Sequence, residues 1–320
     1  DDAVTADKLA NSINTEIAAN TAKVTNATHS GEVTGATTLT IADNVVDEAN
    51  LKVSNAPTNG YVLTAQSGNT GGLTWAAASG VASLGDLSDA TTTATSNIGL
   101  GANAVDSITT GDYNVGLGDN SGTAITEGSH NTAIGFQAML TNTTGSTNTA
   151  VGRDSMRMNL TGSNNVGMGY EALYANTSGS DNIAIGRRAL DANTTANSNV
   201  AVGTSSLTSN TTGGSNTAIG SSSLGANTTA SNNVAVGHYS LLANTTGGYN
   251  TAVGKDALTA NTTGATNDAF GYYALQANTT GSQNVAIGSR SLSANTTASN
   301  NTAVGRDALY ANTTGANNVA

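Results

Sequence analysis

A strict 17-residue period constrains this chain more than any other feature. Asn recurs at every seventeenth position from Asn97 to Asn318, without a single insertion. The clearest copy, at 301–317, reads N-T-A-V-G-R-D-A-L-Y-A-N-T-T-G-A-N. A unit this short cannot bury an apolar face by itself, so the period predicts units that stack on their neighbours. Places in the unit are numbered from one to seventeen, starting at this Asn.

The first five places of the unit predict a short β-strand. The second place is mostly Thr, Val or Ile, the third is always Gly or Ala, the fourth is always apolar and the fifth is always Gly. Alternation puts the bulky second and fourth places on one face and the small third place on the other. Because another backbone can approach a bare Ala/Gly face closely, we expect that face to pack against further copies of the chain.

The remaining places predict a second inward-pointing segment followed by turns. From Met139 onward the ninth place is Leu or Met, and the eighth and eleventh places beside it are mostly small. The N-T-T-G stretch that follows favours turns, since Asn and Gly tolerate left-handed backbone angles. The fifteenth place accepts Ala at Ala196, Ala230 and Ala298, so it does not require positive φ. We therefore expect the sharpest turn at the fifth place or near the end of the unit.

These features together predict an all-β fold, a parallel β-solenoid or β-roll with one unit per coil. Like residues then stack at about 4.8 Å per rung, and thirteen coils make a rod of roughly 60 Å. Stacking aligns the Asn residues of the first and twelfth places into hydrogen-bonded ladders. A helical repeat is disfavoured by the Gly, Thr and Asn content, and disorder by the unbroken phase. The core of one coil is thin, which favours packing of several copies.

The segment before the repeats, and the first two repeats themselves, depart from the regular unit. The strand-like runs on either side of Q-S-G-N-T-G-G predict a hairpin anchored by Trp75. Ile108 and Ile125 occupy the twelfth place of the first two units, where later full units have Asn, so these units are expected to form an N-terminal cap. The predicted segments are a helical or extended stretch at 1–30, short strands and the hairpin at 31–80, a linker at 81–96, and repeats at 97–320 with the last one truncated.

Composition argues against several classes of partner. The net charge is −11, yet only 10% of the residues are charged, so no clustered basic face predicts nucleic-acid binding. There is no Cys and no apolar run of 18 residues, which argues against disulfides and membrane insertion. The chain starts without Met and stops three residues into a unit, so we expect a fragment of a longer polypeptide.

Parts of the chain resemble known fibre proteins. The words N-T-A-V-G at 148–152 and N-V-A-I-G at 284–288 are similar to a word in the head repeats of YadA-like trimeric autotransporter adhesins. The whole unit, together with Thr5–Asn44 and Gly60–Ala76, looks more like phage tail-fibre proteins, including those of cyanophages. That resemblance implies a homotrimeric shaft in the tail of a virion. It also implies attachment to the tail or baseplate at one end, and a tip outside this sequence that binds a host receptor, either a glycan or an outer-membrane protein.

Two other functions stay open. The first is a bacterial cell-surface adhesin or surface filament whose repeats bind directly. The second is an ice-binding solenoid, which needs a flat face of Thr. The two Thr of each unit are adjacent, as at Thr262 and Thr263, and point to opposite sides of a strand. Asn261 and Thr263 remain able to share a face.

No residues predict catalysis, a cofactor or a metal site. His29, His130 and His238 lie far apart and in unlike contexts, and no nucleophile or acid–base pair recurs, so we expect no enzyme. Eleven N-x-S/T sequons fall at the twelfth place, where turn and stacking roles are favoured over glycosylation. The variable sixth, seventh and tenth places suggest solvent exposure, and their tyrosines are candidate surface or glycan contacts: Tyr170, Tyr174, Tyr239, Tyr272, Tyr273 and Tyr310.

Overall fold

The computed structural model describes residues 15, 33–34, 40–41, 61–65, 73–77, 90–91 and 96–320. The chain divides into two compact units, Asp1–Gly80 and Val81–Ala320. The predicted helical or extended segment at 1–30 lies outside the described residues except for Thr15, and so does most of the predicted linker at 81–96. No helix within the described part of the chain is long and apolar enough to cross a membrane.

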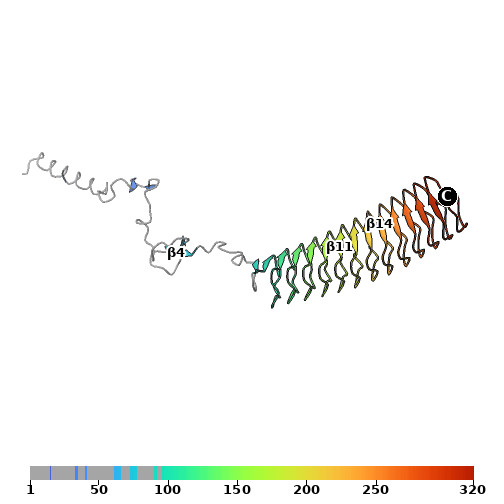
Figure 1. The fold of residues 1–320 in the computed structure, drawn as a ribbon. Coiled ribbons are helices and arrows are strands. Elements are labelled where there is room, and N and C mark those ends of the chain that lie inside the picture. The colour runs from blue at the N-terminus through green and yellow to red at the C-terminus, as the bar shows by residue number, and fades with distance from the viewer. Residues whose placement is uncertain are drawn as a thin grey trace, which may run out of the picture. The chain divides into compact units, whose positions relative to one another are not determined.

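Two small antiparallel pairs form the described part of the first unit. Strand β1 (Val33–Thr34) pairs with β2 (Thr40–Ile41). Strand β3 (Tyr61–Ala65) pairs with β4 (Leu73–Ala77) and places Leu63 opposite Trp75 (Figure 1).

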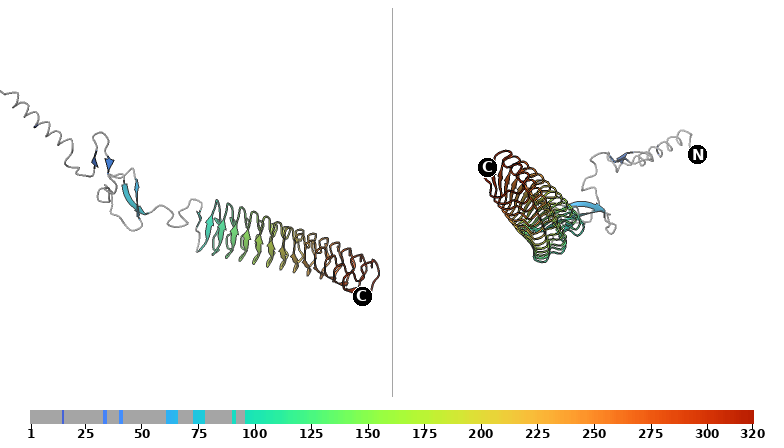
Figure 2. Two further views of the ribbon diagram at one scale, coloured as in Figure 1. Left: turned by 90° about the horizontal axis from the view of Figure 1, so that it is seen from above. Right: turned by 90° about the vertical axis from the view of Figure 1, so that its right-hand side faces the viewer.

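The second unit is a parallel β-solenoid, which confirms the predicted fold class. Thirteen three-residue strands stack in chain order, and β5 (Ala90–Thr91) pairs antiparallel with the first of them (Figure 1). Figure 2 shows from two further sides that each rung follows the one before it. The strands are β6 (Ile98–Leu100), β7 (Val115–Leu117), β8 (Thr132–Ile134), β9 (Thr149–Val151), β10 (Val166–Met168), β11 (Ile183–Ile185), β12 (Val200–Val202), β13 (Thr217–Ile219), β14 (Val234–Val236), β15 (Thr251–Val253), β16 (Asp268–Phe270), β17 (Val285–Ile287) and β18 (Thr302–Val304).

The register of the sheet follows the 17-residue period at every step. Equivalent places pair with each other, as when Ala201 of β12 lies opposite Ala218 of β13. The strand occupies only the second to fourth places, and turns form the rest of each coil. Backbone hydrogen bonds also join the turns of neighbouring rungs, for example from Leu207 N to Ser223 O at 3.0 Å. The rungs are therefore joined on every side.

The small third place points into the coil, so the expected use of the Ala/Gly face is wrong. Ala201, Ala218 and Ala235 are fully buried within the solenoid, whereas Ile219 at the fourth place is 42% exposed. The bulky second and fourth places face outward from the sheet. An interface between copies through the Ala/Gly face is excluded, because the turns of the same coil already cover that face.

The narrow interior of the coil explains this orientation. The opposite wall holds the eighth- and ninth-place side chains, which nearly touch the strand. A methyl group added at Gly167 would lie 2.8 Å from Ser155 Oγ and 3.1 Å from Met156 Cγ. Only Gly or Ala fits between the strand and this wall, so the larger second- and fourth-place side chains must lie outside.

A single row of large side chains fills the interior, as predicted for the ninth place. Leu207, Leu224 and Leu241 are fully buried, and Met139 and Met156 take the same place in earlier rungs. Each Leu lies between the equivalent residues of the rungs before and after it. Each rung from 131–147 onward therefore contributes a Leu or Met to one continuous core.

Two ladders of buried Asn run along the axis, which confirms the predicted stacking. At the first place, Asn199 Nδ2 donates to Asn182 Oδ1 at 3.2 Å and to Gly213 O at 3.0 Å. At the twelfth place, Asn227 Nδ2 donates to Asn210 Oδ1 at 2.8 Å. These amides line the interior, so the sequons from Asn142 to Asn295 serve as ladder residues that solvent does not reach.

Four places in each rung turn the chain with positive φ. In the rung 216–232, φ is 133° at Gly220, 55° at Ser222, 50° at Leu224 and 62° at Asn232. The sharpest turn is expected at the fifth place or near the end of the unit; both have positive φ, and so do the seventh and ninth places, which were not predicted. The fifteenth place is not among the residues with positive φ, which agrees with its tolerance of Ala.

Candidate functional surface

The turn after each strand gathers most of the charged and aromatic side chains of the solenoid. We name the sixth, seventh and tenth places of all rungs the cation–aromatic corner. Every Lys or Arg after Lys52 belongs to it, as do Phe136 and the six candidate tyrosines. The basic residues are Arg153, Arg157, Arg187, Arg188, Lys255, Arg290 and Arg306.

Cations lie against rings of neighbouring rungs on this corner. The guanidinium carbon of Arg153 is 5.9 Å from the ring centre of Phe136 and 5.7 Å from that of Tyr170. Arg157 lies 5.8 Å from the ring centre of Tyr174, and its Nη1 donates to the Tyr174 hydroxyl at 2.8 Å. The structure thus brings Tyr170 and Tyr174 into one cluster in the first half of the solenoid.

A second cluster lies nearer the C-terminus. The ring centres of Tyr272 and Tyr273 are 3.9 Å apart, and Lys255 Nζ is 5.6 Å from the first and 5.7 Å from the second. Arg290 lies 5.4 Å from the ring centre of Tyr310. All the tyrosines named here remain partly accessible, with 45% exposure at Tyr272 and 48% at Tyr310.

Tyr239 lies apart from the cluster of Lys255, Tyr272 and Tyr273. Its ring centre is 3.7 Å from that of His238, the preceding residue. His130 stacks on Tyr113 at 4.9 Å between ring centres, at the seventeenth place on another side of the coil. His29 lies outside the described residues. Among the residues that the structure describes, no group of three His, Cys, Asp or Glu could hold a metal ion.

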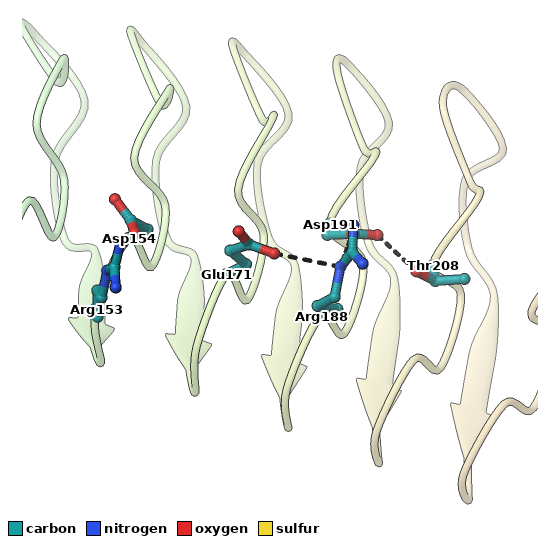
Figure 3. A network of polar contacts seen from close by, with 6 residues as sticks. All are labelled: Arg153, Asp154, Glu171, Arg188, Asp191 and Thr208. Carbon is teal, nitrogen blue, oxygen red and sulfur yellow. Dashed lines mark hydrogen bonds and ion pairs between the residues drawn. The ribbon is translucent and has the colours of Figure 1, made fainter.

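Ion pairs partner most of the cations on the corner, and Figure 3 shows Arg153 and Arg188 among them. Arg188 Nε lies 3.2 Å from Glu171 Oε2 on the previous rung and 2.9 Å from Asp191 Oδ2. Asp191 also accepts a hydrogen bond from the Thr208 hydroxyl on the next rung, at 2.7 Å. Figure 3 shows these side chains on successive rungs, beside the Arg153–Asp154 pair. The corner therefore carries alternating charges that largely neutralise one another.

These contacts shift the protonation equilibria of exposed groups. The hydrogen bond from Arg290 lowers the pKa of the Asp307 carboxyl, and the 2.7 Å ion pair spans two rungs. A hydrogen bond to Asp256 raises the pKa of Lys255. A hydrogen bond to Tyr273 raises the pKa of Tyr272. Each shift favours the form that the partner stabilises, and none creates a group poised for proton transfer near neutral pH.

The cation partners of the tyrosines are the part of this surface that residue type alone missed. The signal lay in the period, because Phe136, Arg153 and Tyr170 are 17 residues apart, and so are Lys255 and Tyr272. Residues that share a place on consecutive rungs are neighbours in a solenoid. Searching each place along the repeats finds these contacts, whereas Arg290 and Tyr310 occupy different places and are paired only by the structure.

A second outward surface is the sheet itself. We name the second- and fourth-place side chains of β6–β18 the sheet face. Ile185 is 38% exposed, Val304 is 58% exposed, and Asp268 is the one charged member of these two rows. Asn261 is fully buried while Thr263 is exposed, so the shared face that an ice-binding solenoid would need there is absent. No protein-family model, curated protein or solved structure matches the chain.

Proposed function

We propose that the solenoid is the shaft of a homotrimeric phage tail fibre, which holds a receptor-binding tip away from the virion. The observation that carries this proposal is the uninterrupted stack of rungs with one pairing register. From the rung 131–147 onward the rungs also share the Leu or Met row and the two Asn ladders, so length comes from the number of rungs. A rod of this construction suits a spacer. The resemblance of the repeat to the sequences of phage tail-fibre proteins is the reason for proposing a phage tail.

The proposed partners follow from that setting. One end of the fibre joins the virion tail or baseplate, and a tip outside this sequence binds a glycan or an outer-membrane protein on the host. The corner supports a structural role, because its cations contact carboxylates and rings of the same chain. Such contacts strengthen rung-to-rung stacking and leave few groups unpartnered for a ligand.

Solution mass and particle shape test the proposal together. Sedimentation equilibrium of residues 1–320 is expected to give a mass near three chains that resists dilution. Electron microscopy is expected to show a rod segment of about 60 Å, set by thirteen rungs at about 4.8 Å each. A monomer throughout the accessible concentration range would overturn the trimeric shaft.

The grouping of rings and cations on one corner favours a second candidate, a surface adhesin whose repeats bind glycans directly. Exposed tyrosine rings can stack on sugar rings, and Tyr272 and Tyr273 place two rings together, 3.9 Å apart between centres. Replacing both with Ser is then expected to abolish binding of residues 1–320 to host-derived glycans. Equal binding by the parent and the double variant would remove this candidate.

A further inference from the structure

The sheet face is a long outward surface of the solenoid, and its fourth-place side chains are half-buried or exposed on every rung. Its fourth-place row is apolar on every rung, and much of it reaches solvent. Exposure is 45% at Leu117, 42% at Ile219 and 43% at Ile287. Burying apolar area of this kind stabilises an assembly by roughly 25 cal/mol per Å².

The other sides of the coil are satisfied from within. On the cation–aromatic corner, ion pairs and ring contacts link successive rungs. On the N-T-T-G side, hydroxyls bond along the axis, as when Thr228 Oγ1 donates to Thr245 O at 3.2 Å. Interaction between copies through either of those sides would compete with contacts that already exist.

The size of the sheet face fits a stable interface. Thirteen rungs at about 4.8 Å and strands of about 10 Å give on the order of 600 Å² in projection, before side-chain relief is added. The largest apolar patch of an ordinary monomer is about 300–600 Å², and a standard interface buries about 800 Å² on each partner. In projection, the sheet face therefore reaches the upper end of that patch range and approaches the area that a standard interface buries on each partner.

We propose that the sheet face is the surface through which copies of this chain associate, in register along the axis. A second copy has the same rung spacing, so its ridges of second- and fourth-place side chains match along the full length. A globular partner would match only a few rungs. In a trimer, three such strips enclose a common axis. The inference deepens the proposed trimeric shaft and rests on it.

Two double variants with the same charge change test the surface. Val202→Lys with Ile219→Lys places two charges on the sheet face at neighbouring rungs. Thr212→Lys with Thr229→Lys places two charges on the exposed fourteenth place of the same rungs. Sedimentation equilibrium is expected to show at least tenfold weaker association for the sheet-face variant. The control is expected to match the parent, and far-UV circular dichroism checks that each variant keeps its strands.

A distance measurement covers the case in which the charged sheet-face variant fails to fold. The chain has no Cys, so a nitroxide label reacts only with an introduced thiol. Labels on Ile219→Cys are expected to lie closer to their equivalents in the other copies than labels on Thr229→Cys. Pulsed electron–electron double resonance measures both distances in the assembled protein.

The outcomes separate this inference from the proposed function. A parent that is monomeric overturns both. A parent that is trimeric, with a sheet-face variant that associates equally well, overturns only the sheet face. So does a longer distance between labels at position 219 than between labels at position 229.

Discussion

The twelfth-place Asn ladder can be tested by changing one atom of one amide. In the Asn227→Asp variant, an oxygen replaces Nδ2 at a site that is fully buried in the middle of the stack. In the native chain, Nδ2 donates to Asn210 Oδ1 at 2.8 Å and to Ala230 O at 3.0 Å. Oδ1 accepts from Asn244 Nδ2 at 3.0 Å. A carboxylate keeps the accepted bond and loses both donated ones.

The size of the effect follows from the one acceptor that is left without a donor. Asn210 Oδ1 loses its donor, which costs about 1–3 kcal/mol, whereas Ala230 O still accepts from Asn216 Nδ2 at 2.9 Å. Burial of the new charge adds to this, because no cation lies in the ladder to compensate it. The Asn227→Asp variant is therefore expected to unfold at a clearly lower urea concentration than the parent near neutral pH.

The loss of stability in the Asn227→Asp variant is expected to depend on pH. Burial and the facing oxygens raise the pKa of the new carboxyl in the folded chain above its unfolded value of about 3.9. A group with a raised pKa stabilises the fold most below the unfolded value and least above the folded one. The deficit relative to the parent is thus smallest near pH 3 and grows as the pH rises. Urea titrations followed by far-UV circular dichroism at several pH values measure it.

A matched variant in the same rung provides the control. Thr229→Asp introduces the same charge at an exposed place two residues away, where no ladder bond is lost. Its unfolding midpoint is expected to stay close to that of the parent. If both variants unfold at the same urea concentration near neutral pH, the ladder does not stabilise the stack and the reasoning fails.

Three further changes examine the core, the turns and the corner. Leu224→Ala removes one member of the buried row and is expected to cost about 2–5 kcal/mol in urea unfolding. Gly220→Ala puts a methyl group 2.5 Å from a carbonyl oxygen of the next rung at φ 133°, so it should cost at least about 1–3 kcal/mol. Gly225→Ala, where φ is not positive, should cost clearly less stability when thermal melts of the two Gly→Ala variants are compared. Arg290 lowers the pKa of Asp307 in the folded chain. Their ion pair therefore stabilises the fold at a pH above the pKa of the carboxyl in the unfolded chain, and this stabilisation is lost as the pH falls. Arg290→Gln should flatten that part of the stability–pH curve.

The period made most of the fold predictable. A 17-residue unit with one strand and one N-T-T-G turn has few ways to stack, and parallel stacking aligns Asn with Asn and Leu with Leu. The ladders and the ninth-place core followed from that alignment alone. The surface tyrosines were also identified from variation among units, since a place that accepts Tyr, Ser and Lys does not face a tight interior.

The direction of the strand was not predictable from alternation. Alternation says that the third place opposes the second and fourth, but not which side is inside. Bulk ordinarily points inward, and that expectation failed here because the coil has a single strand and a very close opposite wall. Met156 and its equivalents already fill the space, so only the methyl of Ala fits beside them. Knowing the width of the coil was necessary, and sequence alone does not supply it.

That reversal changes what the apolar fourth place means. An inward place needs no external cause to stay apolar, since packing against its own neighbours suffices. The fourth place points outward, and yet all thirteen units carry Leu, Ile, Val, Met or Phe there. The sixth place also points outward, and it varies freely among Phe136, Arg153, Thr204 and other types. The fourth and sixth places therefore both point outward, but the fourth holds only apolar residue types and the sixth holds many types. Under the proposed association another copy covers the fourth place and leaves the sixth in solvent, which accounts for the difference.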